Sequence, residues 1–155
     1  MKTLYIALVA MGLVSACGAP SVKRDSNGNP IRDPRVEAIV KEFEADYNLD
    51  IAYLPISLVN KLDTENPRTV GLCYNNVASP RDSYIEIRRS YWEDEANEYD
   101  KKTLIYHELG HCVFDRRHKE DKDANGCPVS YMYPSVVSAF CIAINPAHYI
   151  NELGQ

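Results

Sequence analysis

Three of the four histidines in this 155-residue chain, His107, His111 and His118, lie within one stretch of twelve residues. On a helix, positions four apart lie one above the other, so the imidazoles of His107 and His111 face the same point and can share a metal ion. If the helix continued, His118 would lie about 10 Å farther along its axis, at 1.5 Å per residue. Ligands of one ion must each approach to roughly 2.1 Å, which a straight helix does not allow. The spacing therefore predicts a helix that ends near Phe114 and a chain that folds back.

The residues between these histidines supply the rest of a catalytic metal site. Glu108 follows His107 directly, so its carboxylate can reach a water molecule on the metal. Neutral imidazoles hold Zn²⁺ without cancelling its charge, and the ion then acidifies that water. The carboxylate takes the proton and passes it to a leaving amine. We therefore expect one catalytic zinc ion on His107, His111 and His118, with Glu108 as the catalytic base and Asp115 in the left-handed conformation that the turn needs.

Other side chains compete for these roles. A third imidazole within reach favours His118 over a downstream carboxylate, although several remain as alternative third ligands: Glu120, Glu152, Asp115, Asp121 and Asp123. Cys112 projects about 100° around the helix from His111, away from the metal, which disfavours a cysteine nucleophile. His148 stands alone near the end of the chain and is expected on the surface.

The N-terminus carries a targeting segment. Lys2 precedes an apolar run of eleven residues, Leu4 to Val14. This run is too short for a membrane span of roughly 20 residues and suits a signal peptide. Ser15 and Ala16 before Cys17 resemble the lipobox of bacterial lipoproteins, which implies cleavage before Cys17 and acylation of its thiol. We therefore predict a signal peptide over 1–16 and an exported protein that is lipid-anchored to a bacterial membrane, at the outer membrane or cell surface if there are two membranes.

The rest of the chain predicts one α+β domain. A polar, flexible tether is expected over 17–33, and the folded domain over 34–155. Apolar residues recur at helical spacing over 34–47, behind Asp33 and Pro34 as start signals. The remaining predicted elements form a small mixed sheet and a long helix: strands within 51–59, 69–74 and 83–91, a helix over 95–114, and a short apolar segment over 136–144.

Cysteine content and charge narrow the class of protein further. Export to an oxidising compartment makes two disulfides plausible among the four remaining cysteines, with three possible pairings and free thiols as the alternative: Cys73, Cys112, Cys127 and Cys141. A formal net charge of −5 argues against a nucleic-acid partner. The oligomeric state is not predicted.

The segment HELGHCVFDRRH, followed by Tyr131-Met132-Tyr133-Pro134, resembles the metzincin clan of zinc metallopeptidases. It is also similar to small bacterial lipoproteins with HELGHC and a histidine nearby. The resemblance implies a zincin-like fold, a methionine turn with Met132 beneath the zinc, and a substrate that pairs with strand 83–91. The chain departs from the clan's pattern, which has a glycine three residues after the second histidine and the third histidine three residues later: this chain has Phe114 and Arg117 there. Its turn is therefore one residue longer, with Asp115 expected to stand in for the glycine.

The chemistry and the resemblance together predict a zinc metallopeptidase, an endopeptidase that acts on peptides or proteins. The alternative is a non-catalytic, zinc-binding surface lipoprotein that serves as an interaction module. Glu108 favours the enzyme, because a purely structural site does not need a base beside its ligands.

Overall fold

The computed structural model describes residues 24–155. The expected signal peptide over 1–16 and the lipidation site Cys17 lie outside the described residues and stay predictions. Within 24–155, no helix combines the length and apolar character needed to cross a bilayer.

The first helix begins where its start signals predict. A short 3₁₀ turn, η1 (Pro34–Val36), leads into α1 (Glu37–Tyr47), and the Asp33 side chain accepts a hydrogen bond from the backbone N–H of Arg35. The predicted helix over 34–47 is therefore confirmed. Its buried face meets the long helix, where the rings of Phe43 and Tyr106 pack edge to face with centroids 5.2 Å apart.

The sheet has three short strands, β1 (Ile56–Val59), β2 (Gly71–Tyr74) and β3 (Tyr84–Arg88), in the order β1-β3-β2. β1 runs parallel to β3, and β2 runs antiparallel to it. The expectation that strand 83–91 pairs with a substrate is wrong, because β3 is hydrogen-bonded to a neighbour on both edges. The end strand β2 takes its place beside the site.

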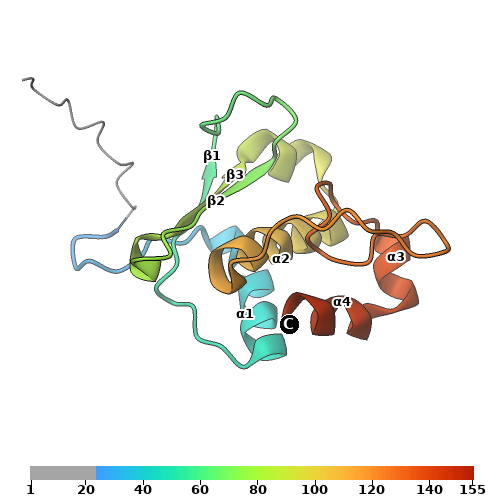
Figure 1. Ribbon diagram of the computed structural model, residues 1–155. Coiled ribbons are helices and arrows are strands. Elements are labelled where there is room, and N and C mark those ends of the chain that lie inside the picture. The colour runs from blue at the N-terminus through green and yellow to red at the C-terminus, as the bar shows by residue number, and fades with distance from the viewer. Residues whose placement is uncertain (1–23) are drawn as a thin grey trace, which may run out of the picture.

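The long helix, α2 (Glu98–Phe114), lies between the sheet and α1 (Figure 1). A single π-helical turn, η3 (Tyr91–Glu95), precedes it, and Asn97 caps it by accepting hydrogen bonds from two backbone N–H groups. The helix ends at Phe114, and Asp115 follows with φ 52° and ψ 33°. The predicted end of the helix and the left-handed Asp115 are both confirmed.

The chain from 115 to 138 is mainly irregular and is followed by two short helices, α3 (Ala139–Ile144) and α4 (Pro146–Leu153). Helix α4 was not predicted from the sequence, because Pro146 indicates the end of the preceding apolar segment. It is instead the first residue of a new helix, with Asn145 as the cap. In Figure 1, α4 lies near α1, and the Tyr47 hydroxyl donates to the Ile150 carbonyl at 2.9 Å.

Two disulfides select one of the three possible pairings. Cys73–Cys112 joins β2 to α2, and Cys127–Cys141 joins the irregular segment to α3. The first bond fixes the end strand of the sheet to the helix that carries His107 and His111.

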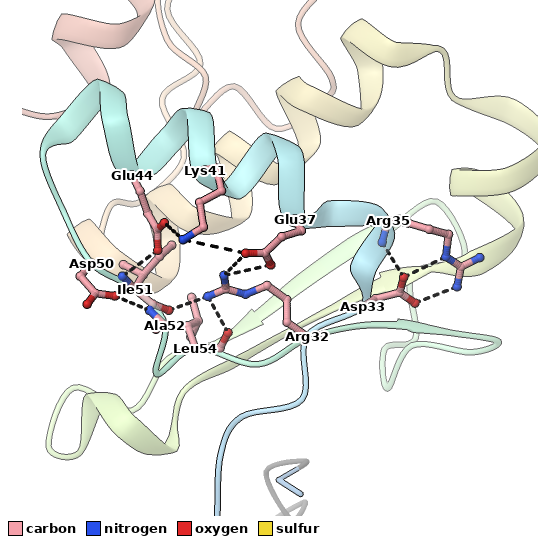
Figure 2. A network of polar contacts seen from close by, with 10 residues as sticks. All are labelled: Arg32, Asp33, Arg35, Glu37, Lys41, Glu44, Asp50, Ile51, Ala52 and Leu54. Atoms are coloured by element: carbon pink, nitrogen blue, oxygen red, sulfur yellow. Dashed lines mark hydrogen bonds and ion pairs between the residues drawn. The ribbon is translucent and has the colours of Figure 1, made fainter.

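A polar network lies along one side of α1 and joins it to the segments before and after it (Figure 2). Arg32 donates hydrogen bonds to the Glu37 carboxylate and, at 2.7 Å, to the Ile51 carbonyl. The Glu44 carboxylate accepts from the backbone N–H of Ile51 at 3.1 Å. These contacts hold the turn after α1 in place, and they bring Arg32, from the segment expected as a tether, against the domain.

Candidate active site

The return of the chain at Asp115 brings His118 next to the two helical histidines. The Nε2 atom of His107 lies 3.1 Å from Nε2 of His111 and 3.2 Å from Nε2 of His118. One ligand atom from each of the three residues lies within 4.8 Å of the others. Three tetrahedral ligands at about 2.1 Å from one ion would lie roughly 3.4 Å apart. The donor set therefore fits a single metal ion.

Backbone carbonyls fix the tautomers of the two helical histidines. Nδ1 of His107 lies 2.8 Å from the Tyr131 carbonyl, and Nδ1 of His111 lies 2.6 Å from the Arg116 carbonyl. A carbonyl oxygen only accepts, so both Nδ1 atoms carry the proton and both Nε2 atoms present lone pairs. Two lone pairs that face each other at 3.1 Å repel unless a cation lies beside them. Imidazole nitrogen suits zinc and also copper, iron and nickel.

Burial keeps these imidazoles neutral. It lowers the pKa of His107 to about 4, opposed by the hydrogen bond to the Tyr131 carbonyl and assisted by the neighbouring His111 and His118. Burial also lowers the pKa of His111. At neutral pH, His107 and His111 therefore need not release protons to bind a metal.

Glu108 is buried, with 4% of its surface exposed, and lies against the backbone of β2. Burial raises the pKa of its carboxyl to about 8, against the lowering effect of a hydrogen bond from the Cys73 N–H. A Cβ atom at Gly71 would lie 2.5 Å from Glu108 Oε1, so this close approach requires a glycine. The sequence reading missed Gly71, although a glycine inside a strand signals close approach of another group.

Met132 is fully buried and packs against α2 at Gly110. A Cβ atom at Gly110 would lie 2.4 Å from its sulfur, so Gly110 lets the methionine reach the helix backbone. The Tyr131 side chain is also buried and packs on the rings of Tyr106 and Tyr149. Tyr131 contacts the site through its backbone carbonyl, which accepts the hydrogen bond from His107.

The three histidines and Glu108 line one cavity of about 710 Å³. Its walls come from β2 and the chain before it, from α2, and from the segment after the methionine turn. The lining includes Val70, Gly71, Leu72, Tyr91, Leu104 and Val136.

None of the alternative third ligands joins this cluster, although Asp115 lines the cavity, where its carboxylate accepts a hydrogen bond from Asn75. The Glu152 carboxylate forms ion pairs with Arg116 and Lys119. In residues 24–155, the His107–His111–His118 group is the one cluster of histidine, cysteine and acidic side chains arranged to hold a metal ion. His148 is exposed as expected, and its Nε2 donates to the Val129 carbonyl at 2.8 Å.

Two histidines one helical turn apart, a third from a returning loop and a buried glutamate beside them define a metal centre of the HExxH class. Comparison with known families agrees. A family model described as "Putative phage metallopeptidase" matches residues 29–149, and the chain belongs to this family. No curated protein and no solved structure matches the chain.

Proposed function

We propose that this protein is a zinc-dependent endopeptidase whose catalytic base is Glu108. The observation that carries the proposal is the convergence of three Nε2 atoms next to a buried carboxylate in one cavity. The family assignment supports peptide hydrolysis as the reaction class.

His107, His111 and His118 would hold the ion, which supplies Lewis acidity toward the scissile carbonyl and lowers the pKa of the attacking water. The carbonyls of Tyr131 and Arg116 keep two of these rings oriented with Nε2 toward the ion. A cation in the triad favours the ionised form of Glu108, whose pKa burial alone has raised. The carboxylate then takes the proton of the attacking water and returns it to the leaving amine.

The substrate is an extended peptide that lies along β2. This strand is at the end of the sheet and lines the cavity through Gly71, Leu72 and Cys73. A peptide on its outer edge would pair with the strand backbone, which provides affinity without requiring a particular side chain. The lipid anchor on Cys17 would hold the enzyme at the surface of a bacterial membrane.

The test compares the zinc-loaded protein with Glu108→Gln on a mixed peptide library, with products identified by mass spectrometry. The matched control is Glu98→Gln, which changes a carboxylate with 85% of its side chain exposed at the start of the same helix. We expect internal cleavage by the parent and by the control, and loss of at least about 100-fold in rate for Glu108→Gln, because a general base contributes that much or more.

All three proteins should bind one zinc ion, because none of the changes touches a ligand. If none of them cleaves peptides while all bind zinc, the enzyme proposal fails. The alternative of a zinc-binding surface lipoprotein that acts as an interaction module would then stand.

A further inference from the structure

Glu152 on α4 is a buried carboxylate that the catalytic mechanism does not use. Only 8% of the residue is exposed. Its Oε1 atom lies 2.6 Å from Nη2 of Arg116 and 3.2 Å from Nζ of Lys119. These two cations stand two residues before and one residue after His118, on the segment that returns from the end of α2.

Arg116 connects this carboxylate to the metal site directly. Its Nη1 atom donates to the carbonyls of Glu152 and Leu153 at 2.7 and 3.1 Å, so the guanidinium also satisfies the C-terminus of α4. Its own backbone carbonyl accepts the Nδ1 proton of His111. One residue therefore connects α4, the returning segment and the second expected ligand.

Lys119 connects the same carboxylate to the methionine turn. Its side chain pairs with Glu152, and its backbone N–H donates to the Met132 carbonyl at 2.9 Å. The carbonyl one residue earlier, at Tyr131, accepts from His107. Both carbonyls that orient ligand rings thus lie in segments that the Glu152 contacts hold together.

His118 depends on these contacts more than the other two histidines do. It is exposed, and in the described chain its ring has a polar contact with His107 and none with a backbone carbonyl. The helix and a carbonyl fix His107 and His111, whereas the position of His118 follows from how the segment on either side of it is anchored.

We propose that Glu152 is a positioning residue for the third metal ligand, and that it acts by holding Arg116 and Lys119 on either side of His118. The inference rests on the proposed metal site. Loss of such an indirect partner typically weakens metal binding 10- to 100-fold. We expect Glu152→Gln, which keeps the size of the side chain and removes its charge, to weaken zinc binding by about 30-fold within that range.

The matched control is Glu44→Gln. Like Glu152, the Glu44 side chain is 10% exposed, forms an ion pair and accepts a hydrogen bond from a neighbouring segment, but it belongs to the network around α1. Zinc affinity of the full chain would be measured by competition with a chromophoric chelator. We expect Glu44→Gln to bind zinc within twofold of the parent. Equal weakening by both variants, or none with Glu152→Gln, would overturn the proposal.

A double-mutant cycle with His118→Ala separates positioning from simple loss of negative charge near a cation. If Glu152 acts mainly through His118, Glu152→Gln lowers the zinc affinity of the His118→Ala protein much less than it lowers that of the parent. A purely electrostatic role gives the same loss in both backgrounds and contradicts the proposal. The absorption of bound Co²⁺ provides a second readout, because loss of one imidazole ligand changes its visible spectrum.

Arg116→Lys keeps the net charge and covers the case in which Glu152→Gln does not fold. Arg116 reaches two carbonyls from Nη1 and the carboxylate from Nη2, and a lysine has a single nitrogen that cannot occupy both positions. We therefore expect weaker zinc binding, and unchanged binding would overturn the proposal. These measurements do not involve peptide cleavage. If zinc affinity depends on Glu152 but the protein cleaves no peptide, the peptidase proposal alone is refuted. If the protein cleaves peptides in a way that depends on Glu108 but Glu152→Gln leaves zinc affinity unchanged, the positioning role alone is refuted.

Discussion

Two halves of the domain contribute residues to the expected metal site, and the two halves differ in their content of regular secondary structure. Residues 34–114 form α1, the sheet and α2, and they place His107, Glu108 and His111 on one helix packed into the apolar core. Residues 115–155 contain two short helices and a long irregular segment, and they supply His118 and two orienting carbonyls. Apolar packing and the Cys73–Cys112 disulfide position the first half of the site. The second half also buries Met132 and Leu153 in the core, but the segment around His118 is held by polar contacts.

The polar networks of the two halves differ in the same way. The network around Arg32 and Glu44 lies at the outside of α1 and reinforces a helix that is already packed (Figure 2). The network around Glu152 lies next to the returning segment, which has no regular element of its own. Removing one carboxylate charge should therefore weaken zinc binding when it is done in the network around Glu152, and should leave zinc binding unchanged when it is done in the network around Glu44.

The largest expected effect comes from removing a ligand of the first half. His111→Ala takes away an imidazole that the helix and the Arg116 carbonyl both fix. Zinc affinity should fall more than about 100-fold, beyond the loss expected for an indirect partner. Competition titration measures it, and retention of affinity within tenfold would mean that His111 is not a ligand.

The next effect concerns stability in the second half. Replacing both Cys127 and Cys141 with alanine opens a loop with a sequence separation of 14. The free energy of unfolding should fall by about 3 kcal/mol, as measured by urea denaturation. Zinc affinity should fall as well, because this bond holds the segment that carries the methionine turn. Unchanged affinity in a destabilised protein would show that the halves are not coupled in this way.

Gly71→Ala tests the first half at its closest contact. The new Cβ atom would lie 2.5 Å from Glu108 Oε1 and displace the carboxylate. We expect kcat to fall about 100-fold, the lower end of what general-base catalysis contributes, with zinc affinity unchanged. Steady-state kinetics with a peptide identified from the library measures this, and a kcat within twofold of the parent would contradict the assigned position of the base.

The smallest expected effect concerns the turn that joins the halves. Asn75 donates from Nδ2 to Asp115 Oδ1 at 2.9 Å and to the His111 carbonyl at 3.1 Å. Because both bonds are exposed to water, Asn75→Ala should lower the free energy of unfolding by about 1 kcal/mol. Asp115→Gly, which keeps the left-handed conformation, is the comparison variant, and urea denaturation measures the free energy of unfolding of both variants. A decrease of more than about 3 kcal/mol for Asn75→Ala would contradict this account.

The sequence was most informative where periodicity controls structure. The spacing of His107 and His111, the Asp33 start signal of α1 and the necessary end of α2 before His118 are local properties, and the structure agrees with the end at Phe114 and with Asp115. The start of α2 lies at Glu98, three residues later than expected, because a π-helical turn comes before it. The order of the strands was not predictable, because β1 pairs with β3 and not with β2, the next strand along the chain. No spacing revealed the contact of Gly71 with Glu108 either.

The second half was harder to predict because its order comes from long-range polar contacts. The sequence predicted Glu152 only as an alternative metal ligand. Its ion pair with Arg116 was not predictable, because it depends on α4, and Pro146 indicated the end of a helix and not the start of one. The disulfide pairing was open for the same reason, since the spacing of four cysteines is compatible with three arrangements.

The central claim is that one metal ion joins the two halves of the domain. Anomalous diffraction at the zinc edge from crystals of the zinc-loaded protein tests it most directly. The account predicts one peak at about 2.1 Å from the Nε2 atoms of His107, His111 and His118. A peak bound by His107 and His111 with His118 turned away, or a peak at other residues, would contradict it.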